Sequence, residues 1–368
     1  MEKIDVVVPW VDGNDPEWLA EKATYQNTIQ PFLSGADSPN RYRSWDSIYL
    51  CLSALRANLP WARRILLVTW GHKPRYLDQI LKLKSDVPIE LVKFTDFIPS
   101  QYLPTYNITG IETHMHRLPG LSELFLYVCD DHYILSPMDR ESYISNDGKI
   151  IVNTDDEYLE KLPIYEKFIR KLGLRSHTVP KTLVLWWAFK SRLLALIPTE
   201  THYTKLVANT TRTFKTAFPE ARFSYHPHFP LVFRKDDFRR IWDLFPLETE
   251  STAKSLVRGM DNITPPALAF SLAMKDKAVE ACVRDEYYTA IVPNERRLQI
   301  ELAECLTHDI VCLNDELPGG NVSPKIHETV YRFYQDAALK RLGSPELHAL
   351  YKELAYADSM RDLSSSLS

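Results

Sequence analysis

The sequence has few cysteines and no closely spaced pair of them. Its five cysteines are scattered and odd in number, and no C-x-x-C pair occurs. This arrangement argues against a disulfide framework or a structural zinc site, and it suits a reducing cytoplasm. The chain also lacks an excess of positive charge, since 44 Lys and Arg residues face 48 Asp and Glu residues. We therefore expect no nucleic-acid partner, and a phosphate ligand would need a local basic pocket.

Long apolar runs and glycines are scarce as well. No run of about 18 apolar residues occurs, so we predict no transmembrane segment. The apolar run near the N-terminus is short and ends at Asp12, unlike a signal peptide. We expect a cytoplasmic protein, either free or peripheral at the inner face of the membrane. The 11 glycines against 24 prolines indicate fixed turns rather than flexible linkers. A length of 368 residues allows one large domain with insertions, or two domains.

The most informative stretch is Leu103–Met138, which holds many polar groups around one apolar run. That run, Leu124–Val128, is followed by Cys129 and then by Asp130 and Asp131. A short apolar run ended by charge is typical of a buried strand in an α/β sheet, and ligands of such sheets bind beyond the carboxyl ends of the strands. The two carboxylates could hold a divalent cation that bridges to phosphate, or they could cap a turn. The spacing alone leaves both interpretations open.

A short helix is predicted just before this run, over Thr109–Leu118. Glu112 and His116 are four residues apart, so they would share one face of that helix. With the two aspartates they would form a dense polar cluster around one strand. Taken alone, each histidine in this stretch is more often an ordinary surface residue than a functional one.

The first predicted strand, Ile4–Val8, runs directly into the motif Trp10–Gly13. In a nucleotide-binding sheet, an aromatic ring at this place can pack on a base, and an acid such as Asp12 can meet a ribose or uracil edge. The same motif could be a simple turn, because Asp-Gly is a common turn dipeptide.

Two arginines, Arg41 and Arg43, precede a second helix, whose N-cap we assign to Ser44. A helix N-terminus attracts phosphate, and so do guanidinium groups, for independent reasons. This stretch is therefore a candidate phosphate contact.

The alternation of apolar runs and amphipathic segments predicts an α/β fold with a mostly parallel sheet flanked by helices. We place four strands of this sheet, at Ile4–Val8, Arg64–Thr69, Pro88–Phe94 and Leu124–Val128. A late strand is expected at Ile310–Leu313, with a helix that Ser323 caps and Pro324 starts.

Four blocks of the chain resemble the Stealth family of sugar-1-phosphate transferases. Bacterial members build capsular or extracellular polysaccharide, and an animal relative tags lysosomal enzymes with N-acetylglucosamine 1-phosphate. The blocks are Ile4–Asp15, then Arg41–Leu77 with Leu103–Met138, then His228–Phe238 with Arg258–Asn262, and finally Cys312–Glu316. The resemblance implies a Rossmann-like sheet of the GT-A type found in nucleotide-sugar transferases.

The resemblance also implies an enzymatic reaction. A hexose or N-acetylhexosamine 1-phosphate would pass from a nucleotide diphosphate sugar, of the UDP-GlcNAc kind, to a sugar hydroxyl. The acceptor would be an oligosaccharide or polysaccharide, either free or lipid-linked, and nucleoside monophosphate would leave. Such phosphoryl transfer needs positioning, charge neutralisation and one base, and the implied cofactor is Mg²⁺ or Mn²⁺.

The same resemblance assigns roles to individual residues. His228 would be the general base, with His226 as the alternative, and Arg258 would hold the phosphoryl oxygens. Asp130 and Asp131 would bind the metal, and Asp131 and Glu112 would also act in catalysis. The expected substrate contacts are Trp10, Asp12, Gly13, Arg41, Arg43, His116, Asn314 and Asp315.

The chain is accordingly divided into four parts. Residues 1–138 would form the nucleotide-sugar-binding α/β core, and residues 139–222 a helical insertion or lid. Residues 223–322 would complete the catalytic core, and residues 323–368 would form C-terminal helices.

Two other functions remain open at this point. A conventional metal-dependent glycosyltransferase also places acids at strand ends, but it releases nucleoside diphosphate. A non-catalytic sugar-binding or scaffold protein would be expected to lack some polar groups, whereas every block here keeps its charged members. The pairing of His228 with Arg258 favours phosphoryl transfer.

Overall fold

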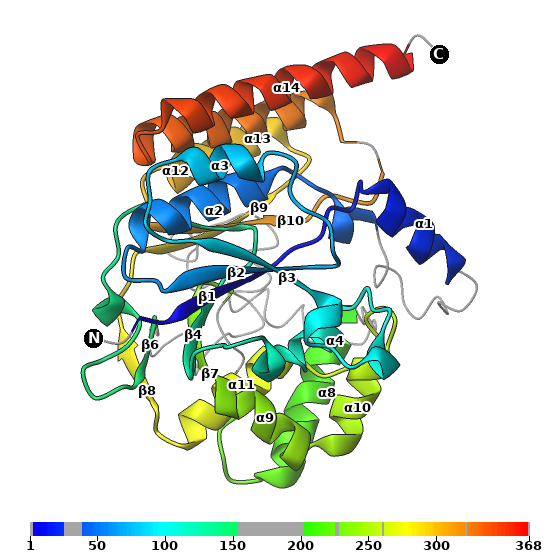
Figure 1. Ribbon diagram of the computed structural model, residues 1–368, viewed down its shortest axis with the longest axis vertical. Coiled ribbons are helices and arrows are strands. Elements are labelled where there is room, and N and C mark those ends of the chain that lie inside the picture. The colour runs from blue at the N-terminus through cyan, green and yellow to red at the C-terminus, as the bar shows by residue number, and fades with distance from the viewer. Residues whose placement is uncertain are drawn as a thin grey trace, which may run out of the picture.

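The computed structural model describes residues 3–25, 39–153, 202–224, 228–259, 261–320 and 322–366. Its centre is a five-stranded sheet in the order β3-β2-β1-β4-β7 (Figure 1). These strands are β1 (Asp5–Pro9), β2 (Arg64–Thr69), β3 (Ile89–Lys93), β4 (Leu124–Tyr127) and β7 (Leu231–Arg234). All neighbouring strands pair in parallel except β4 and β7, which are antiparallel. The predicted mostly parallel α/β sheet is confirmed, and each of its four predicted strands is shifted by at most one residue at either end.

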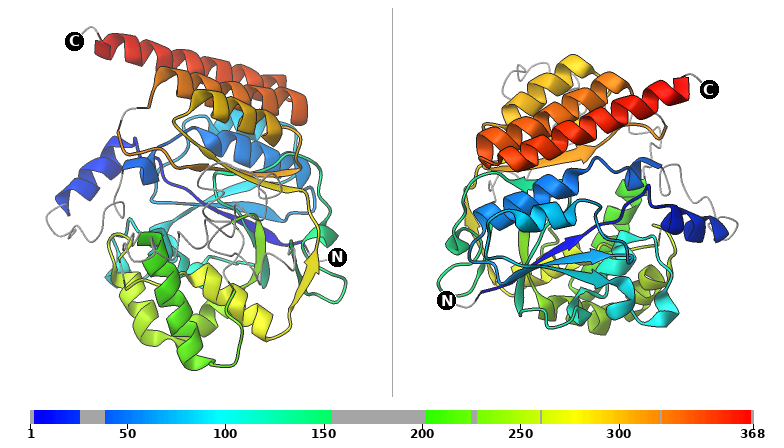
Figure 2. Two further views of the ribbon diagram at one scale, coloured as in Figure 1. Left: turned by 180° about the vertical axis from the view of Figure 1, so that it is seen from behind. Right: turned by 45° about the horizontal axis from the view of Figure 1, so that its top comes forward.

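Helices cover both faces of this sheet (Figures 1 and 2). On one side lie α2 and α3, and on the other lie α8 to α11. Beyond α2 and α3, helices α12 to α14 form an outer layer. The helices are α1 (Pro16–Thr24), α2 (Ser47–Asn58), α3 (Leu77–Lys82), α4 (Ile108–Glu112), α8 (His202–Ala217), α9 (Lys235–Leu244), α10 (Pro246–Lys254), α11 (Pro265–Lys275), α12 (Glu295–Cys305), α13 (Pro324–Asp336) and α14 (Pro345–Ser366). Because both faces are covered, the inner strands hold continuous apolar runs, and every residue of β1 is buried; the edge strand β3 is mostly exposed.

Two smaller sheets complete the fold. β10 (Ile310–Asp315) pairs in parallel with β9 (Glu286–Ile291) and antiparallel with β5 (His132–Ile134). β6 (Ile150–Asn153) pairs in parallel with β8 (Val279–Cys282). The late strand was predicted from the sequence, but β5, β7, β8 and β9 were not. The predicted helical insertion, residues 139–222, contains strand β6 as well as helix α8. Its residues 154–201 lie outside the described residues.

Two local predictions are wrong. The predicted helix over Thr109–Leu118 is broken: α4 ends at Glu112, and a separate 3₁₀ turn follows at Met115–Arg117. The N-cap of α2 is Asp46 rather than Ser44, and Asp46 has a left-handed backbone with φ 54°. The predicted start of the helix at Ser323 is confirmed, since Ser323 caps α13 through its side chain, and Asp15 caps α1 in the same way.

Among the described residues, no helix combines the length and the apolar character that crossing a membrane requires.

Candidate active site

The candidate site lies at the carboxyl edge of the five-stranded sheet. The loops that follow β1 and β4 carry Trp10–Gly13 and the Asp130–Asp131 pair to this edge. β7 runs antiparallel to β4 and pairs Leu231 with Tyr127, so the segment that precedes β7 starts at the same edge. This register brings His228 beside Asp131 although the two are far apart in sequence.

Asp131 is flanked by two imidazoles. Its Oδ2 atom lies 3.7 Å from His228 Nε2, and its Oδ1 atom lies 3.6 Å from His132 Nε2. Burial raises the pKa of Asp131, but the two imidazoles outweigh burial and leave the pKa below its ordinary value. Conversely, burial lowers the pKa of His228, but the carboxylates of Asp131 and Glu112 outweigh burial and raise it. Because 47% of the His228 side chain is exposed, this imidazole is open to a substrate.

The neighbouring Asp130 has a different environment. Its Oδ2 atom accepts a hydrogen bond of 3.0 Å from Ser47 Oγ, in the first turn of α2. Burial and the adjacent Asp131 carboxylate both raise the pKa of Asp130. The two carboxylates repel each other, and Asp131 Oδ1 has no hydrogen-bond partner among the described residues. A cation between or beside them would relieve this repulsion.

Four groups here could hold a metal ion. The ligand atoms of Asp131, His132, His228 and Cys312 all lie within 4.8 Å of one another. However, His132 Nδ1 accepts a hydrogen bond from the Cys129 amide, so its Nε2 carries the proton in the neutral ring. That protonated Nε2 cannot serve as a metal ligand, and at 3.6 Å from Asp131 Oδ1 it makes no hydrogen bond to that oxygen. For a hard cation such as Mg²⁺, the fitting ligands are the carboxylate oxygens of this region.

Glu112 lies at the end of α4 and belongs to the same cluster. Its carboxylate is buried and accepts a hydrogen bond of 2.7 Å from Tyr127 Oη. Burial raises the pKa of Glu112 to about 7, although Tyr127, Arg258 and His228 each act to lower it. The structure therefore brings Glu112, His228 and Arg258 close enough for their charges to interact.

Two buried asparagine side chains position the chain next to Arg258. Asn107 caps α4, and its Nδ2 atom donates to Asn262 Oδ1 at 2.9 Å. The same Asn262 Oδ1 accepts from the Gly259 amide at 2.8 Å. Both asparagines are almost fully buried. Gly259, which directly follows Arg258, and Asn262 are thus fixed to the helix that carries Glu112.

Arg258 and Arg41 lie near each other. Burial and the positive charge of Arg258 lower the pKa of Arg41 to about 10. Two neighbouring guanidinium groups form a local positive potential that suits an anionic ligand. They supply the local positive charge that the overall charge of the chain does not.

The loop after β1 is held by a residue that sequence reasoning did not single out. The Asp12 amide donates to His72 Nε2 at 2.8 Å, and the His72 ring packs edge-on against Trp10 with 5.1 Å between centroids. Gly13 is required by close approach, because a Cβ there would lie 1.7 Å from the Tyr42 carbonyl oxygen. The sequence did offer one signal for His72, because this residue lies shortly after the end of the predicted strand β2.

The remaining predicted substrate contacts have different surroundings. The Arg43 guanidinium forms a 2.8 Å ion pair with Asp315, so both are engaged with each other. Asn314 Nδ2 donates to Tyr288 Oη at 3.1 Å and reaches the site. His116 does not reach the site, because it no longer shares a helical face with Glu112. Burial and the positive charges of Arg117 and of Lys235 in α9 lower the pKa of His116 to about 4. His226 lies outside the described residues.

The C-terminal helices support the site from behind. Tyr331 Oη donates to Asp46 Oδ2 at 2.7 Å, and Tyr351 Oη donates to the Asp46 carbonyl at 2.9 Å. The Leu50 amide donates in turn to Tyr351 Oη at 2.8 Å. These bonds hold Asp46 in its left-handed conformation at the start of α2, next to Ser47. No local sequence signal indicates them, because the partners are separated by most of the chain.

Comparison of the sequence with known protein families and proteins gives clear matches. Residues 2–30 match conserved region 1 of the Stealth proteins, and residues 41–152 match conserved region 2. The receptor polysaccharide phosphotransferase WefC of Streptococcus gordonii is 31% identical over 264 residues, which cover 70% of this chain and 74% of the relative. The capsular polysaccharide phosphotransferase WcwK of Streptococcus pneumoniae is 35% identical over 154 residues, which cover 42% of this chain and 45% of the relative.

Among solved structures, mouse xyloside xylosyltransferase 1 in its apo form aligns with a TM-score of 0.37 and 9% identity, over 78% of this chain and 88% of that chain. Family membership rests on the sequence matches: both conserved regions are present in order, and the similarity to the Streptococcus gordonii relative extends over most of both chains. The chain belongs to the Stealth family.

Proposed function

We propose that this protein transfers a hexose or N-acetylhexosamine 1-phosphate from a nucleotide diphosphate sugar to a sugar hydroxyl. The product is a phosphodiester in a capsular or extracellular polysaccharide, and nucleoside monophosphate is released. One observation carries the proposal: an accessible imidazole, its partner carboxylate and a pair of guanidinium groups meet at one sheet edge. The names of the relatives, which are polysaccharide phosphotransferases, support the same reaction class.

His228 is the general base of the proposed reaction. Its neutral ring takes the proton of the acceptor hydroxyl as the acceptor oxygen bonds to the β-phosphorus. The bond from that phosphorus to the bridging oxygen breaks, and nucleoside monophosphate leaves with the electron pair. Asp131 stabilises the imidazolium that forms, since its carboxylate faces His228 Nε2.

Arg258 and Arg41 hold the diphosphate in this proposal. Guanidinium groups bind phosphoryl oxygens with two parallel hydrogen bonds, and they stabilise the charge that spreads over those oxygens in the transition state. Glu112 orients Arg258 and the donor sugar from the buried side. The loop Trp10–Gly13 is the proposed contact for the nucleoside, which we take to be uridine.

Asp130 and Asp131 would hold Mg²⁺ or Mn²⁺, because their oxygens suit a hard cation and their mutual repulsion favours one. When bound, the ion would neutralise charge on the diphosphate. The acceptor is an oligosaccharide or polysaccharide, free or lipid-linked, so the proposed location is the cytoplasm or the inner face of the membrane.

A conventional glycosyltransferase is the second candidate, because it would use the same metal-binding carboxylates. It would break the C1–O bond and release nucleoside diphosphate. The His228–Asp131 pair beside Arg258 supports phosphoryl transfer, because a base for the acceptor hydroxyl lies next to a cation for phosphoryl oxygens.

The test is to identify the nucleotide product. Purified protein would be incubated with UDP-GlcNAc, MgCl₂ and a capsule-type oligosaccharide acceptor. The proposal predicts UMP, a new phosphodiester signal by phosphorus NMR, and an unchanged anomeric configuration. UDP as the only nucleotide product, without a new phosphodiester, would assign the chain to the second candidate.

A further inference from the structure

An exposed aromatic ring lies beside the proposed base. Tyr288 in β9 is 37% exposed, and its ring centroid is 6.2 Å from that of His228, with 64° between the ring planes. Large aromatic side chains usually bury most of their surface. A ring that stays open at the rim of a polar site is therefore available to a ligand.

Strand register places this ring in a row with two other site residues. Cys312 in β10 pairs with Tyr288 on one side and with His132 on the other. Directly opposed residues on neighbouring strands project from the same face of a sheet. His228 contacts both ends of this row, because its ring centroid is also 5.0 Å from that of His132. One flank of His228 is thus occupied by His132 and Asp131, and the other is open toward Tyr288.

The Tyr288 ring is held from its hydroxyl end. Asn314 Nδ2 donates to Tyr288 Oη at 3.1 Å, and Tyr288 Oη donates to Glu316 Oε1 at 3.4 Å. These bonds engage the hydroxyl and place an amide and a carboxylate at the edge of a ring that is partly exposed. Such a surface combines an apolar plane with hydrogen-bonding groups beside it.

The two sides of His228 differ in charge. Arg41 and Arg258 attract the anionic diphosphate. The Tyr288 side instead presents the Glu316 carboxylate, which repels phosphate and accepts hydrogen bonds from neutral hydroxyls. A neutral sugar has an apolar C–H face and a polar edge of hydroxyls, which match a flat ring bordered by Asn314 and Glu316.

We propose that Tyr288 is the platform for the acceptor hexopyranose. The sugar stacks on the Tyr288 ring and presents one hydroxyl to His228, while Asn314 and Glu316 bind neighbouring hydroxyls. This assignment rests on the proposed function and adds to it the place of the acceptor. It also assigns Asn314, an expected substrate contact, to the acceptor.

The first test separates acceptor binding from donor binding in the full chain. Tyr288→Ala removes the ring, Tyr288→Phe keeps the ring without its hydroxyl, and Tyr356→Ala is a matched control at an exposed tyrosine of α14. For Tyr288→Ala we expect an acceptor KM about 3- to 10-fold higher, from the usual size of ring contacts. The donor KM and the slow hydrolysis of UDP-GlcNAc should not change. Tyr288→Phe should stay within about 2-fold of the parent protein.

The second test needs no turnover. Saturation-transfer NMR with a panel of methyl hexopyranosides should show transfer to sugar C–H protons for the parent protein and for Tyr288→Phe, and much less for Tyr288→Ala. Unchanged acceptor KM and unchanged pyranoside binding in Tyr288→Ala would overturn the platform. An equal loss of transfer and donor hydrolysis would overturn it too, because the ring would then position His228. If the parent protein releases UDP, the proposed function fails, while pyranoside binding still decides this inference.

Discussion

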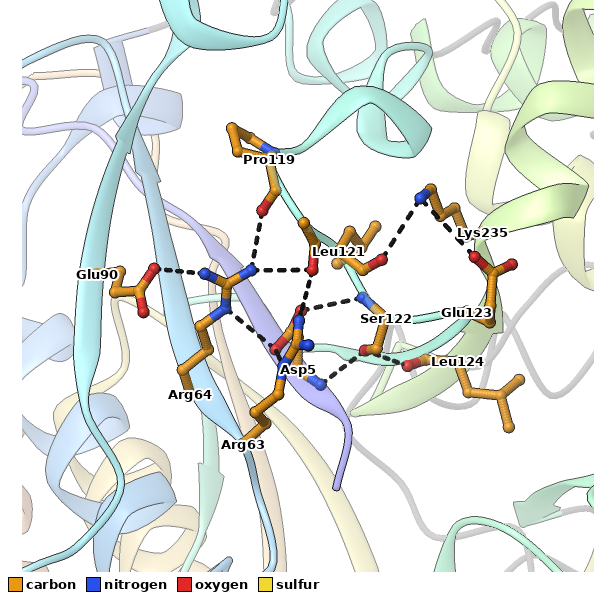
Figure 3. Close-up of polar contacts among 11 residues, drawn as sticks. Asp5, Arg63, Arg64, Glu90, Pro119, Leu121, Ser122, Glu123, Leu124 and Lys235 are labelled. Atoms are coloured by element: carbon orange, nitrogen blue, oxygen red, sulfur yellow. Dashed lines mark hydrogen bonds and ion pairs between the residues drawn. The ribbon is translucent and has the colours of Figure 1, made fainter. Parts of the chain in front are cut away.

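Buried carboxylates are compensated by partners at one edge of the central sheet and incompletely compensated at the other. At the amino edge, Asp5 is fully buried but completely paired (Figure 3). Arg63 Nε donates to Asp5 Oδ1 at 2.7 Å, and the Ser122 amide donates to Oδ2 at 3.0 Å. Arg64 adds a further bond to Oδ1. Burial raises the pKa of Asp5, but these partners outweigh burial and leave the pKa below its ordinary value.

At the carboxyl edge the compensation is incomplete. Burial raises the pKa of Glu112 to about 7, and the pKa of Asp130 is raised as well. Among the described residues, Asp131 Oδ1 and His132 Nε2 have no hydrogen-bond partner. This difference indicates that the buried charge at the amino edge stabilises the fold. The buried charges at the carboxyl edge destabilise the fold and are available to a ligand.

The largest effect is expected from removing groups at the carboxyl edge that would act on substrate. His228→Ala should lower kcat by about 10²–10⁴, the usual contribution of a general base. Arg258→Ala should lower kcat/KM by at least as much and should also weaken donor binding. Initial rates and UDP-GlcNAc binding by calorimetry measure both changes. Full activity in a folded His228→Ala protein would remove His228 from the mechanism.

Glu112→Gln tests whether a buried charge at the carboxyl edge lowers the free energy of unfolding. The pKa of Glu112 is about 7 in the folded protein and near its ordinary 4.5 in the unfolded chain, so the folded state binds more protons between these values. Stability of the parent protein therefore falls as pH rises from 4.5 to 7. Glutamine keeps an acceptor for Tyr127 without the charge. In metal-free buffer we expect Glu112→Gln to be more stable by up to about 3 kcal/mol at pH 8, with no difference near pH 4.

Activity is the second readout for this variant. Glu112→Gln should lose transfer activity while it gains stability. A variant that is less stable than the parent at pH 8 would contradict the comparison, because Glu112 would then be a stabilising charge like Asp5.

Asp5→Asn tests the amino edge and should have the opposite sign. Removing the charge weakens its bonds to Arg63 and Arg64, so the free energy of unfolding should fall by about 1.5–3 kcal/mol at pH 7. Because the folded pKa of Asp5 is lowered, this stabilisation is present above the ordinary value of 3.8 and is lost as pH falls below it. Urea unfolding at pH 7 and pH 3 measures the change. Activity per folded molecule should be unaltered, and a selective loss of kcat would count against a purely stabilising role.

The smallest effect is expected at Tyr351, which connects the outer helices to the site. Tyr351→Phe removes the hydroxyl that bonds the Asp46 carbonyl and the Leu50 amide. We expect a loss of about 1 kcal/mol in stability and a several-fold lower kcat with an unchanged donor KM. Tyr334→Phe is the matched control, because that hydroxyl bonds only Tyr133 Oη among the described residues. Equal kcat values in the two variants would show that α14 does not support the site.

Features that depend on residues close together in the chain could be predicted from the amino-acid sequence. Strands β1, β2 and β4 are built around short apolar runs, and their burial follows from that pattern, whereas the edge strand β3 is mostly exposed. The helix caps at Asp15 and Ser323 depend on side chains next to the helix they cap. The place of Asp130 and Asp131 beyond β4 follows in the same way.

Contacts between segments far apart in the chain could not be predicted in this way. His228 reaches Asp131 because β7 joins β4 in antiparallel register, and Tyr288 reaches His228 because β9 pairs with β10. The left-handed Asp46 replaced the predicted cap Ser44 because hydroxyls from α13 and α14 bind it. Local patterns encode which segments are strands or helices, but pairing between segments depends on surfaces that exist only once the chain has folded.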